Sequence, residues 1–323
     1  MKILQIFVIL SFITVLLNPS LADAEESKFN PFGLKIAAAI KEGFESNVFL
    51  DSSRKGDWFT ETDIYAEGEY KITDKLAVGV EYDFINLSYN EFTDLNLVNN
   101  EGRAFFKYYL KDGFSIKTGY VLDSVWYPHD KDGTYFTQGP LAEIEYYINK
   151  DLFLTGAYEF KEYDYDKRKI KDGTGKTLST NREDCMHSMT FGVGDFVNIG
   201  RYIKDLLVKV EEKIDFNDSN DEYMDYYDYI SYKTSAFISM PVFKVLYLVG
   251  HGSYRYKDFD TRKNIDLNAT ETQKTFVLGA TVYYNIYKSA YISAGYTYTQ
   301  TYSNEPTNRY SDSISSAGIH IFF

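Results

Sequence analysis

The chain has 323 residues, a formal net charge of −13, and 31 Tyr and 24 Phe beside only 6 Pro. The acidic balance argues against nucleic acid as a partner, and the single cysteine, Cys185, excludes an internal disulfide. The length would usually suggest two domains, yet no linker or shift in composition divides the chain. Mean hydropathy stays low, at −0.35, in spite of the many aromatic residues. A membrane β-barrel has both properties, because only alternate residues of each strand face lipid and aromatic residues gather at both interfaces.

Residues 1–24 have the pattern of a secretory signal peptide. Lys2 supplies the positive charge, Ile3 to Leu17 form an apolar run, and Ala22-Asp23-Ala24 offers a small-residue cleavage site. The run is too short for a membrane-spanning helix, and no later run reaches the ~18 apolar residues that such a helix needs. We therefore expect export to the periplasm, cleavage after Ala24 and one mature domain, residues 25–323.

The mature chain is a series of stretches in which apolar or aromatic residues alternate with small or charged ones. This period of two predicts β-strands with one apolar and one polar face. The predicted strands are residues 34–43, 58–71, 76–88, 99–110, 114–126, 135–148, 152–163, 186–197, 206–216, 227–239, 243–256, 271–285, 289–301 and 309–323.

The links between these strands alternate in length. Links after even-numbered strands are short, as at 72–75, 111–113 and 149–151, and links after odd-numbered strands are mostly longer and more polar. The longest runs from Asp164 to Cys185. A soluble β-sandwich could share the alternation, but it would hide most of its aromatic residues in a core. We expect an all-β, transmembrane, antiparallel up-and-down β-barrel of about 14 strands, with short periplasmic turns and long extracellular loops.

The predicted strand 206–216 shows how the two faces are assigned. Leu206, Val208 and Val210 share one face, and Lys209 and Glu211 share the other. A charge exposed to lipid costs about 2–4 kcal/mol at the bilayer midplane, so the charged face should line the lumen.

One residue of this strand departs from the pattern. Glu212 falls on the apolar face, so we expect it near a membrane interface or after a β-bulge.

The same assignment along the chain predicts a charged lumen. We expect it to be either a water-filled pore with an acidic wall facing a basic one, or a salt-bridged interior that holds the barrel in shape and is narrowed by the 164–185 link. The predicted pore-lining residues are Glu61, Asp63, Glu67, Glu69, Glu81, Asp83, Arg103, Lys107, Lys117, Glu143, Glu145, Glu159, Lys161, Lys209, Glu211, Lys213, Asp215, Lys233, His251 and Arg255.

A catalytic site has one candidate, His251 with Ser253, which could act as base and nucleophile. Both side chains should face water, whereas lipid hydrolases of the Gram-negative outer membrane present their catalytic groups toward lipid. The remaining histidines, His129, His187 and His320, have no metal-ligand spacing. We therefore expect no enzyme activity, no catalytic residues, no metal and no cofactor.

Two segments carry a resemblance to a known family. Glu45-Ser46-Asn47-Val48-Phe49 resembles the signature that opens many outer-membrane β-barrel porins of proteobacteria, some of them associated with exopolysaccharide export. Residues 295–298, 303–306 and 310–312, with the terminal aromatic, resemble the closing hairpin of the same group, and a similar hairpin ends the barrels of surface lipoprotein assembly modifiers. Phe323 resembles the C-terminal aromatic signal read by the barrel assembly machinery, which the resemblance therefore implies as a partner in biogenesis.

Three hypotheses for function follow. The first is a porin-like channel in the Gram-negative outer membrane, surrounded by outer-membrane lipids and lipopolysaccharide, for passive passage of small polar solutes or saccharides. The second is a structural or surface-display barrel with a closed lumen, which binds a partner through its extracellular loops. The third, and weakest, is an outer-membrane lipid-modifying enzyme that uses His251 and Ser253.

Overall fold

The computed structural model describes residues 32–111, 113–199, 203–223, 227–263 and 269–323. The predicted signal peptide lies outside the described residues. The strands are β1 (Phe32–Glu45), β2 (Asp57–Thr73), β3 (Leu76–Tyr89), β4 (Leu97–Lys111), β5 (Phe114–Trp126), β6 (Tyr135–Tyr147), β7 (Leu152–Lys171), β8 (Thr177–Ile199), β9 (Ile203–Ser219), β10 (Tyr229–Phe243), β11 (Leu246–Lys263), β12 (Thr270–Tyr287), β13 (Ala290–Ser303) and β14 (Tyr310–Phe322). Short 3-10 turns lie at Thr93–Leu95 and Pro306–Asn308.

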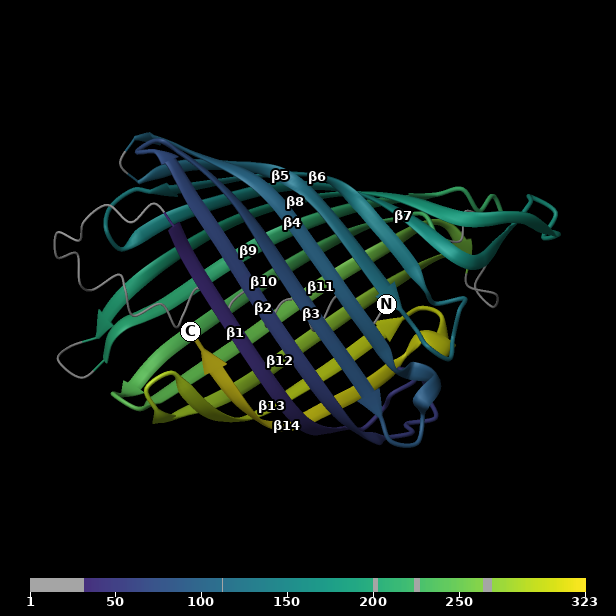
Figure 1. The fold of residues 1–323 in the computed structure, drawn as a ribbon. Coiled ribbons are helices and arrows are strands. Elements are labelled where there is room, and N and C mark those ends of the chain that lie inside the picture. Colours follow the sequence, from purple (N-terminus) through teal and green to yellow (C-terminus); the bar gives the residue numbers. More distant parts are fainter. Residues whose placement is uncertain (1–31, 112, 200–202, 224–226, 264–268) are drawn as a thin grey trace.

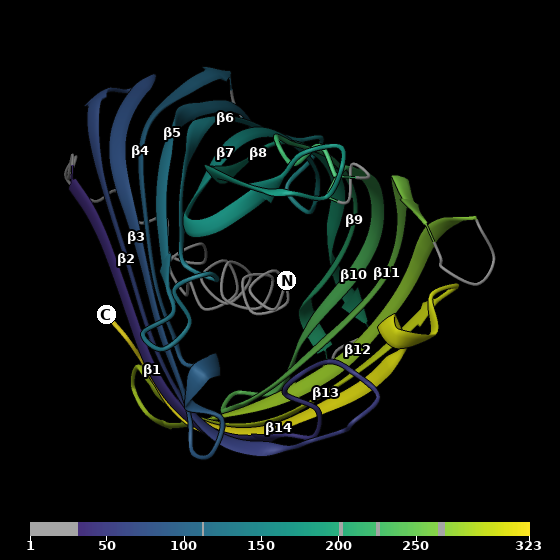
Figure 2. The same cartoon turned by 90° about the vertical axis from the view of Figure 1, so that its right-hand side faces the viewer.

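The strands form one closed barrel (Figures 1 and 2). Each strand is antiparallel to its neighbours in sequence, and β14 closes the ring against β1, from Ala37 opposite Phe322 to Glu45 opposite Ile314. Closure leaves no sheet edge with unpaired backbone groups, which a bilayer would not tolerate. The prediction of a 14-stranded, antiparallel up-and-down β-barrel is confirmed. Among the residues that the structure describes, no helix is long and apolar enough to cross a membrane.

The outside of the barrel carries the apolar face of the alternation. Val80, Phe106, Phe191 and Leu278 come from four different strands, and 59 to 69% of each residue's surface is exposed. Soluble monomers rarely expose apolar patches larger than a few hundred Å². This wall is therefore suited to lipid rather than water.

The links at the two ends of the barrel differ in length. At one end the links are short, as at 74–75, 148–151, 244–245 and 288–289. At the other end most are longer, and 46–56 is an example.

The predicted long link from Asp164 to Cys185 is mostly strand, so this interpretation was wrong. β7 continues to Lys171 and β8 starts at Thr177, leaving a turn at 172–176. The polar composition of this segment suggests a loop, but here polar side chains form the contacts that hold the two strands of a hairpin together. The Lys169 ammonium donates to the Ser179 carbonyl and to Asn181 Oδ1, both at 2.6 Å.

Glu212 lies on the outer face without a bulge. The β9 register runs without interruption against β10, with Glu212 opposite Thr234, and it is equally regular where Glu212 faces Phe191 of β8. Thr234 Oγ1 donates to Glu212 Oε2 at 2.6 Å. Of the two predicted alternatives, the bulge is wrong, and a position near a membrane interface stays a prediction. The Thr234 hydroxyl on the neighbouring strand gives the carboxylate a polar partner.

The two segments that carry the family resemblance meet at the seam of the barrel. Ser46 Oγ and the Asn47 backbone N–H donate to Asp312 Oδ1, at 3.1 and 3.0 Å. Asn47 Nδ2 donates to the Ser311 carbonyl at 3.0 Å, and Ser46 N–H donates to the Ser313 carbonyl at 2.9 Å. The opening and closing motifs therefore tie the end of β1 to β14.

Apolar side chains also pack inside the barrel, in two clusters. One lies near the end with the longer links and consists of Val48, Phe59, Leu87, Tyr89 and Leu97. The other lies toward the short-turn end and consists of Phe153, Leu207, Phe237, Val249 and Tyr283. The charged part of the lumen lies between these two clusters.

Candidate functional site in the charged lumen

The predicted pore-lining residues share the inner face of the wall. A central cavity is lined by Glu61, Lys209, Glu211, Lys233, His251 and Arg255, together with Lys41 and residues of β12–β14. The other predicted residues are assigned to the same face in two ways. Some lie an even number of positions from a cavity-lining residue on the same strand, as Asp63 does from Glu61. Others lie opposite an inward residue of the next strand: Glu159 of β7 lies opposite Leu141 of β6, and Leu141 shares its face with Glu143.

The wall from β1 to β7 is held by ion pairs. The Lys41 ammonium lies 2.5 Å from Glu61 and 2.6 Å from Asp63. The Lys117 ammonium lies 2.9 Å from Glu81 and 3.1 Å from Glu143. Each cation thus bridges carboxylates, which lowers the cost of placing charges in a partly buried wall.

Glu101 is a further centre of this network. Its carboxylate lies 2.5 Å from the Arg103 guanidinium and 3.5 Å from the Lys161 ammonium. Arg103 also approaches Glu81 at 3.8 Å, and Lys161 approaches Glu159 at 3.4 Å. Together with the Lys117 ion pairs, these contacts connect the five neighbouring strands β3–β7.

A row of three carboxylates crosses the same wall. Asp83 of β3 lies opposite Glu101 of β4, and Glu101 lies opposite Asp123 of β5. Among the described residues, Asp83 and Asp123 form no ion pair, and the buried Asp123 Oδ1 has no hydrogen-bond partner. We call Asp83, Glu101 and Asp123 the carboxylate row.

A row of three cations crosses the wall on β9–β11. Lys213 lies opposite Lys233, and Lys233 lies opposite Arg255. Lys213 pairs with Asp215 at 3.1 Å, whereas Lys233 and Arg255 form no ion pair within the described part of the chain. Like charges directly opposite each other destabilise a sheet. We call Lys213, Lys233 and Arg255 the cation row.

The two rows face each other across the lumen. β4 and β11 are seven strands apart in either direction around the ring of fourteen. Figure 2 shows β3 and β4 on one side of the barrel and β10 and β11 on the other. The lumen is therefore crossed by a field from one wall to the other.

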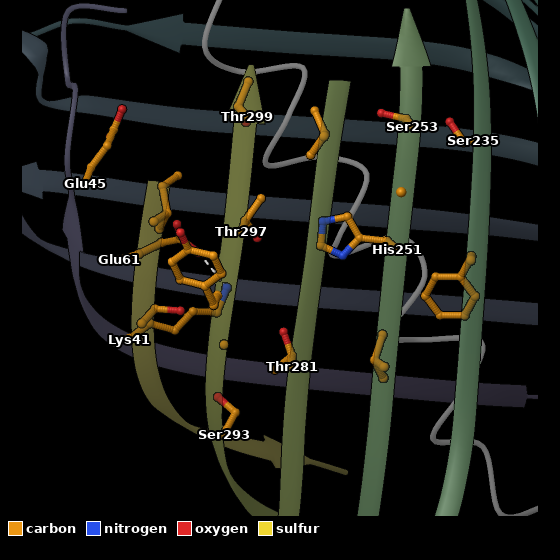
Figure 3. A pocket seen from close by; sticks show the side chains of 18 of the residues that line it. Lys41, Glu45, Glu61, Ser235, His251, Ser253, Thr281, Ser293, Thr297 and Thr299 are labelled. Atoms are coloured by element: carbon orange, nitrogen blue, oxygen red, sulfur yellow. Dashed lines mark hydrogen bonds and ion pairs between the residues drawn. The ribbon is translucent and has the colours of Figure 1, made fainter. Parts of the chain in front are cut away.

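A third sector of the wall, on β12–β14, is rich in hydroxyl groups (Figure 3). Thr281, Ser293, Thr297 and Thr299 line the central cavity from β12 and β13, and Ser316 lines it from β14. This sector lies between the cation row on β9–β11 and the Lys41 ion pairs on β1 and β2. It carries few charges and presents mainly neutral hydrogen-bonding groups.

Several inward residues were missed in the sequence. Lys41, Glu101 and Asp123 belong to the inner face, and the alternation could have found them, since Glu101 lies two residues before Arg103. Lys257 is buried on β11, with its ammonium 3.3 Å from the centre of the Tyr229 ring. No local pattern marks that contact.

His251 and Ser253 both line the cavity, but among the described contacts no hydrogen bond joins their side chains, which Figure 3 shows apart. The His251 ring extends over Gly279 of β12, where an added Cβ would lie 2.2 Å from the ring. Within the described residues, no group of three or more His, Cys, Asp or Glu side chains could hold a metal ion.

Comparison with known proteins supports the class of fold. No family model and no curated protein matches this chain. Among solved structures, the chain is similar to OmpT, an outer membrane protein of Vibrio cholerae: the outer-membrane-expressed form has 13% identity over 93% of this chain and 100% of that one, with a TM-score of 0.51. The in-vitro-folded trimer form has 12% identity over 91% and 100%, also with a TM-score of 0.51. The protein thus has the fold of an outer-membrane β-barrel.

Proposed function

We propose that the protein is a channel of the Gram-negative outer membrane that passes small polar solutes through a water-filled lumen with a transverse field. The observation that carries this proposal is the pair of opposed rows, the carboxylate row on β3–β5 and the cation row on β9–β11. Unpaired charges are costly away from water. Asp83, Asp123, Lys233 and Arg255 are therefore best accommodated where water and ions reach them.

Such a field gives the channel a means of selection. A solute with separated charges or a large dipole aligns between the two walls, whereas an apolar solute gains nothing from them. We further propose that the short turns face the periplasm and that the barrel is inserted by the assembly machinery of the outer membrane. No catalytic role is assigned to the lumen, because His251 and Ser253 are not hydrogen-bonded to each other.

A second candidate is a surface-display barrel with a closed lumen. The ion-pair network on β1–β7 and the two inward apolar clusters favour it, since both fill space inside the barrel. In that case the long hairpin of β7 and β8 would bind a partner. Deleting its outer part, residues 167–180, should then abolish partner binding and leave conductance unchanged or raised.

Recording in planar bilayers tests the channel. We expect the purified protein to give discrete conductance steps, with its folded state checked by its shift on unheated gels. The double variant Asp83→Asn with Asp123→Asn should shift permeability toward anions, and Lys233→Gln with Arg255→Gln should shift it toward cations. A folded protein without any conductance step would exclude the channel.

A further inference from the structure

Two of the three residues of the cation row, Lys233 and Arg255, lack a fixed counter-ion among the described residues. Between residues 207 and 259, the inner faces of β9–β11 carry five cations and two carboxylates, which leaves a net charge of +3: Lys209, Lys213, Lys233, Arg255 and Lys257 against Glu211 and Asp215. Both carboxylates are already engaged. Glu211 lies 2.7 Å from Lys209, and Asp215 accepts from Ser188 and Ser231 besides Lys213.

Three cations of this sector therefore have no carboxylate in the described part of the chain: the Lys257 ammonium lies over the Tyr229 ring, and Lys233 and Arg255 lie directly opposite each other in register. Holding them side by side costs free energy in the empty channel. An anion placed between them would remove this repulsion. The planar guanidinium of Arg255 can bind a carboxylate through two parallel hydrogen bonds, and Lys233 adds a point charge.

The surroundings of this pair indicate what else the ligand carries. Ser235 and Ser253 lie beside Lys233 and Arg255 on β10 and β11, and Thr297 and Thr299 of β13 line the same cavity. Gly295 also lines the cavity, and the Thr281 hydroxyl fills the space beside it, 2.9 Å from where a Cβ of residue 295 would lie. A ligand held at the cation row is thus next to a wall of hydroxyl donors and acceptors.

We infer that Lys233 and Arg255, with the hydroxyl groups of β10–β13, form a binding site for a carboxylate-bearing sugar in the lumen. The carboxylate binds the two cations, and the sugar hydroxyls bind the Ser and Thr side chains. This inference rests on the proposed channel function and names the solute class that the channel favours.

Blocking of single-channel current tests the site, with galacturonate trimer as the acidic probe and maltotriose as the neutral one. We expect the galacturonate trimer to interrupt the current at far lower concentration than maltotriose. The variant Lys233→Gln with Arg255→Gln should raise the half-blocking concentration of the acidic trimer about tenfold or more, since two charge-assisted contacts are lost. The exchange Lys233→Arg with Arg255→Lys keeps both charges and should keep most of the block.

The matched control is Lys107→Gln with Lys117→Gln, which removes two cations that also lie opposite each other, on β4 and β5 of the other wall. This control should alter conductance but keep the acidic block. An equal loss of block in both double variants would overturn the site, because it would show a general field effect. Equal block by sulfate at the same ionic strength would overturn the sugar assignment.

Calorimetric titration of the detergent-solubilised barrel with the galacturonate trimer separates the two proposals. Binding that is lost in Lys233→Gln with Arg255→Gln, in a protein that gives no conductance, would retain the site and remove the channel. Conductance without any difference between the acidic and the neutral trimer would retain the channel and overturn the site.

Discussion

Charged residues of the lumen differ in whether a partner lies opposite them in register. Lys41 lies between Glu61 and Asp63 and contacts both, so it stabilises the wall as part of a network. Lys233 and Arg255 lie opposite each other and have no carboxylate. The first kind of residue is structural, whereas the second is the kind that the proposed channel offers to a solute.

Asp312 is a buried hydrogen-bond acceptor at the seam between β1 and β14. It is 3% exposed and accepts hydrogen bonds from Ser46 Oγ and the Asn47 backbone N–H. We expect Asp312→Ala to lower the free energy of unfolding by about 1–3 kcal/mol, because the buried donors lose a charged acceptor. Urea unfolding of the detergent-folded barrel measures this.

The control for this substitution is Asp94→Ala, since Asp94 is exposed in the 3-10 turn between β3 and β4. It should change stability by less than about 0.5 kcal/mol. Equal unfolding midpoints for the two variants would show that the seam contacts contribute nothing measurable.

At the scale of the strands, side-chain contacts support the part of β7 and β8 that extends beyond the other strands. β7 and β8 are the longest strands, and polar and aromatic residues support their outer halves. The Arg182 guanidinium lies 3.3 Å from the centre of the Tyr227 ring and 4.6 Å from that of Tyr165, and it pairs with Asp184. In the connecting turn, hydrogen bonds from Thr174 and the Lys176 backbone hold the pKa of Asp172 below its usual range.

Arg182→Ala should therefore loosen the outer hairpin without unfolding the barrel. Each cation–π contact is worth about 0.5–2 kcal/mol, and Asp184 would lose its partner. We expect proteinase K to cleave the hairpin of the folded protein several-fold faster, while the membrane-spanning part stays intact on gels. Lys167→Ala removes an exposed cation from the same hairpin and should be cleaved at the wild-type rate; the same rate for Arg182→Ala would contradict the proposed role.

At the scale of the whole molecule, closure brings the C-terminal residue next to the first strand, β1. The Phe323 backbone N–H donates to the Ile36 carbonyl at 2.8 Å, and the Ile36 N–H donates to the Phe323 carbonyl at 3.2 Å. The Phe323 side chain is 77% exposed. Its ring thus contributes little to packing and is free to be recognised during assembly.

Phe323→Ala should separate assembly from stability. We expect normal refolding into detergent, because the substitution removes little buried surface, and a several-fold lower amount of folded barrel in the outer membrane of cells. Phe322→Ala is the comparison, since the Phe322 ring packs inward against Tyr291 at 5.5 Å between centroids and its loss should weaken the refolded barrel. An unchanged amount of assembled Phe323→Ala protein would exclude the signal.

The sequence by itself determined the strand number and the face of each residue. Both are local properties, because a period of two assigns each side chain to one face and the turns separate one strand from the next. The inward positions of Glu61, Lys209 and Arg255 follow from that pattern alone. Charge then identified the inner face, since only that face can be hydrated.

Tertiary structure decided which of these residues meet. The cation row, the carboxylate row and the seam between Asn47 and Asp312 each join residues of different strands, and register and closure fix those pairings. The extent of the β7–β8 hairpin was also beyond the local pattern, because Arg182 is held by Tyr227, 45 positions away in the sequence. Contacts between distant residues carry no periodic signal, so they can be seen only when the barrel is closed.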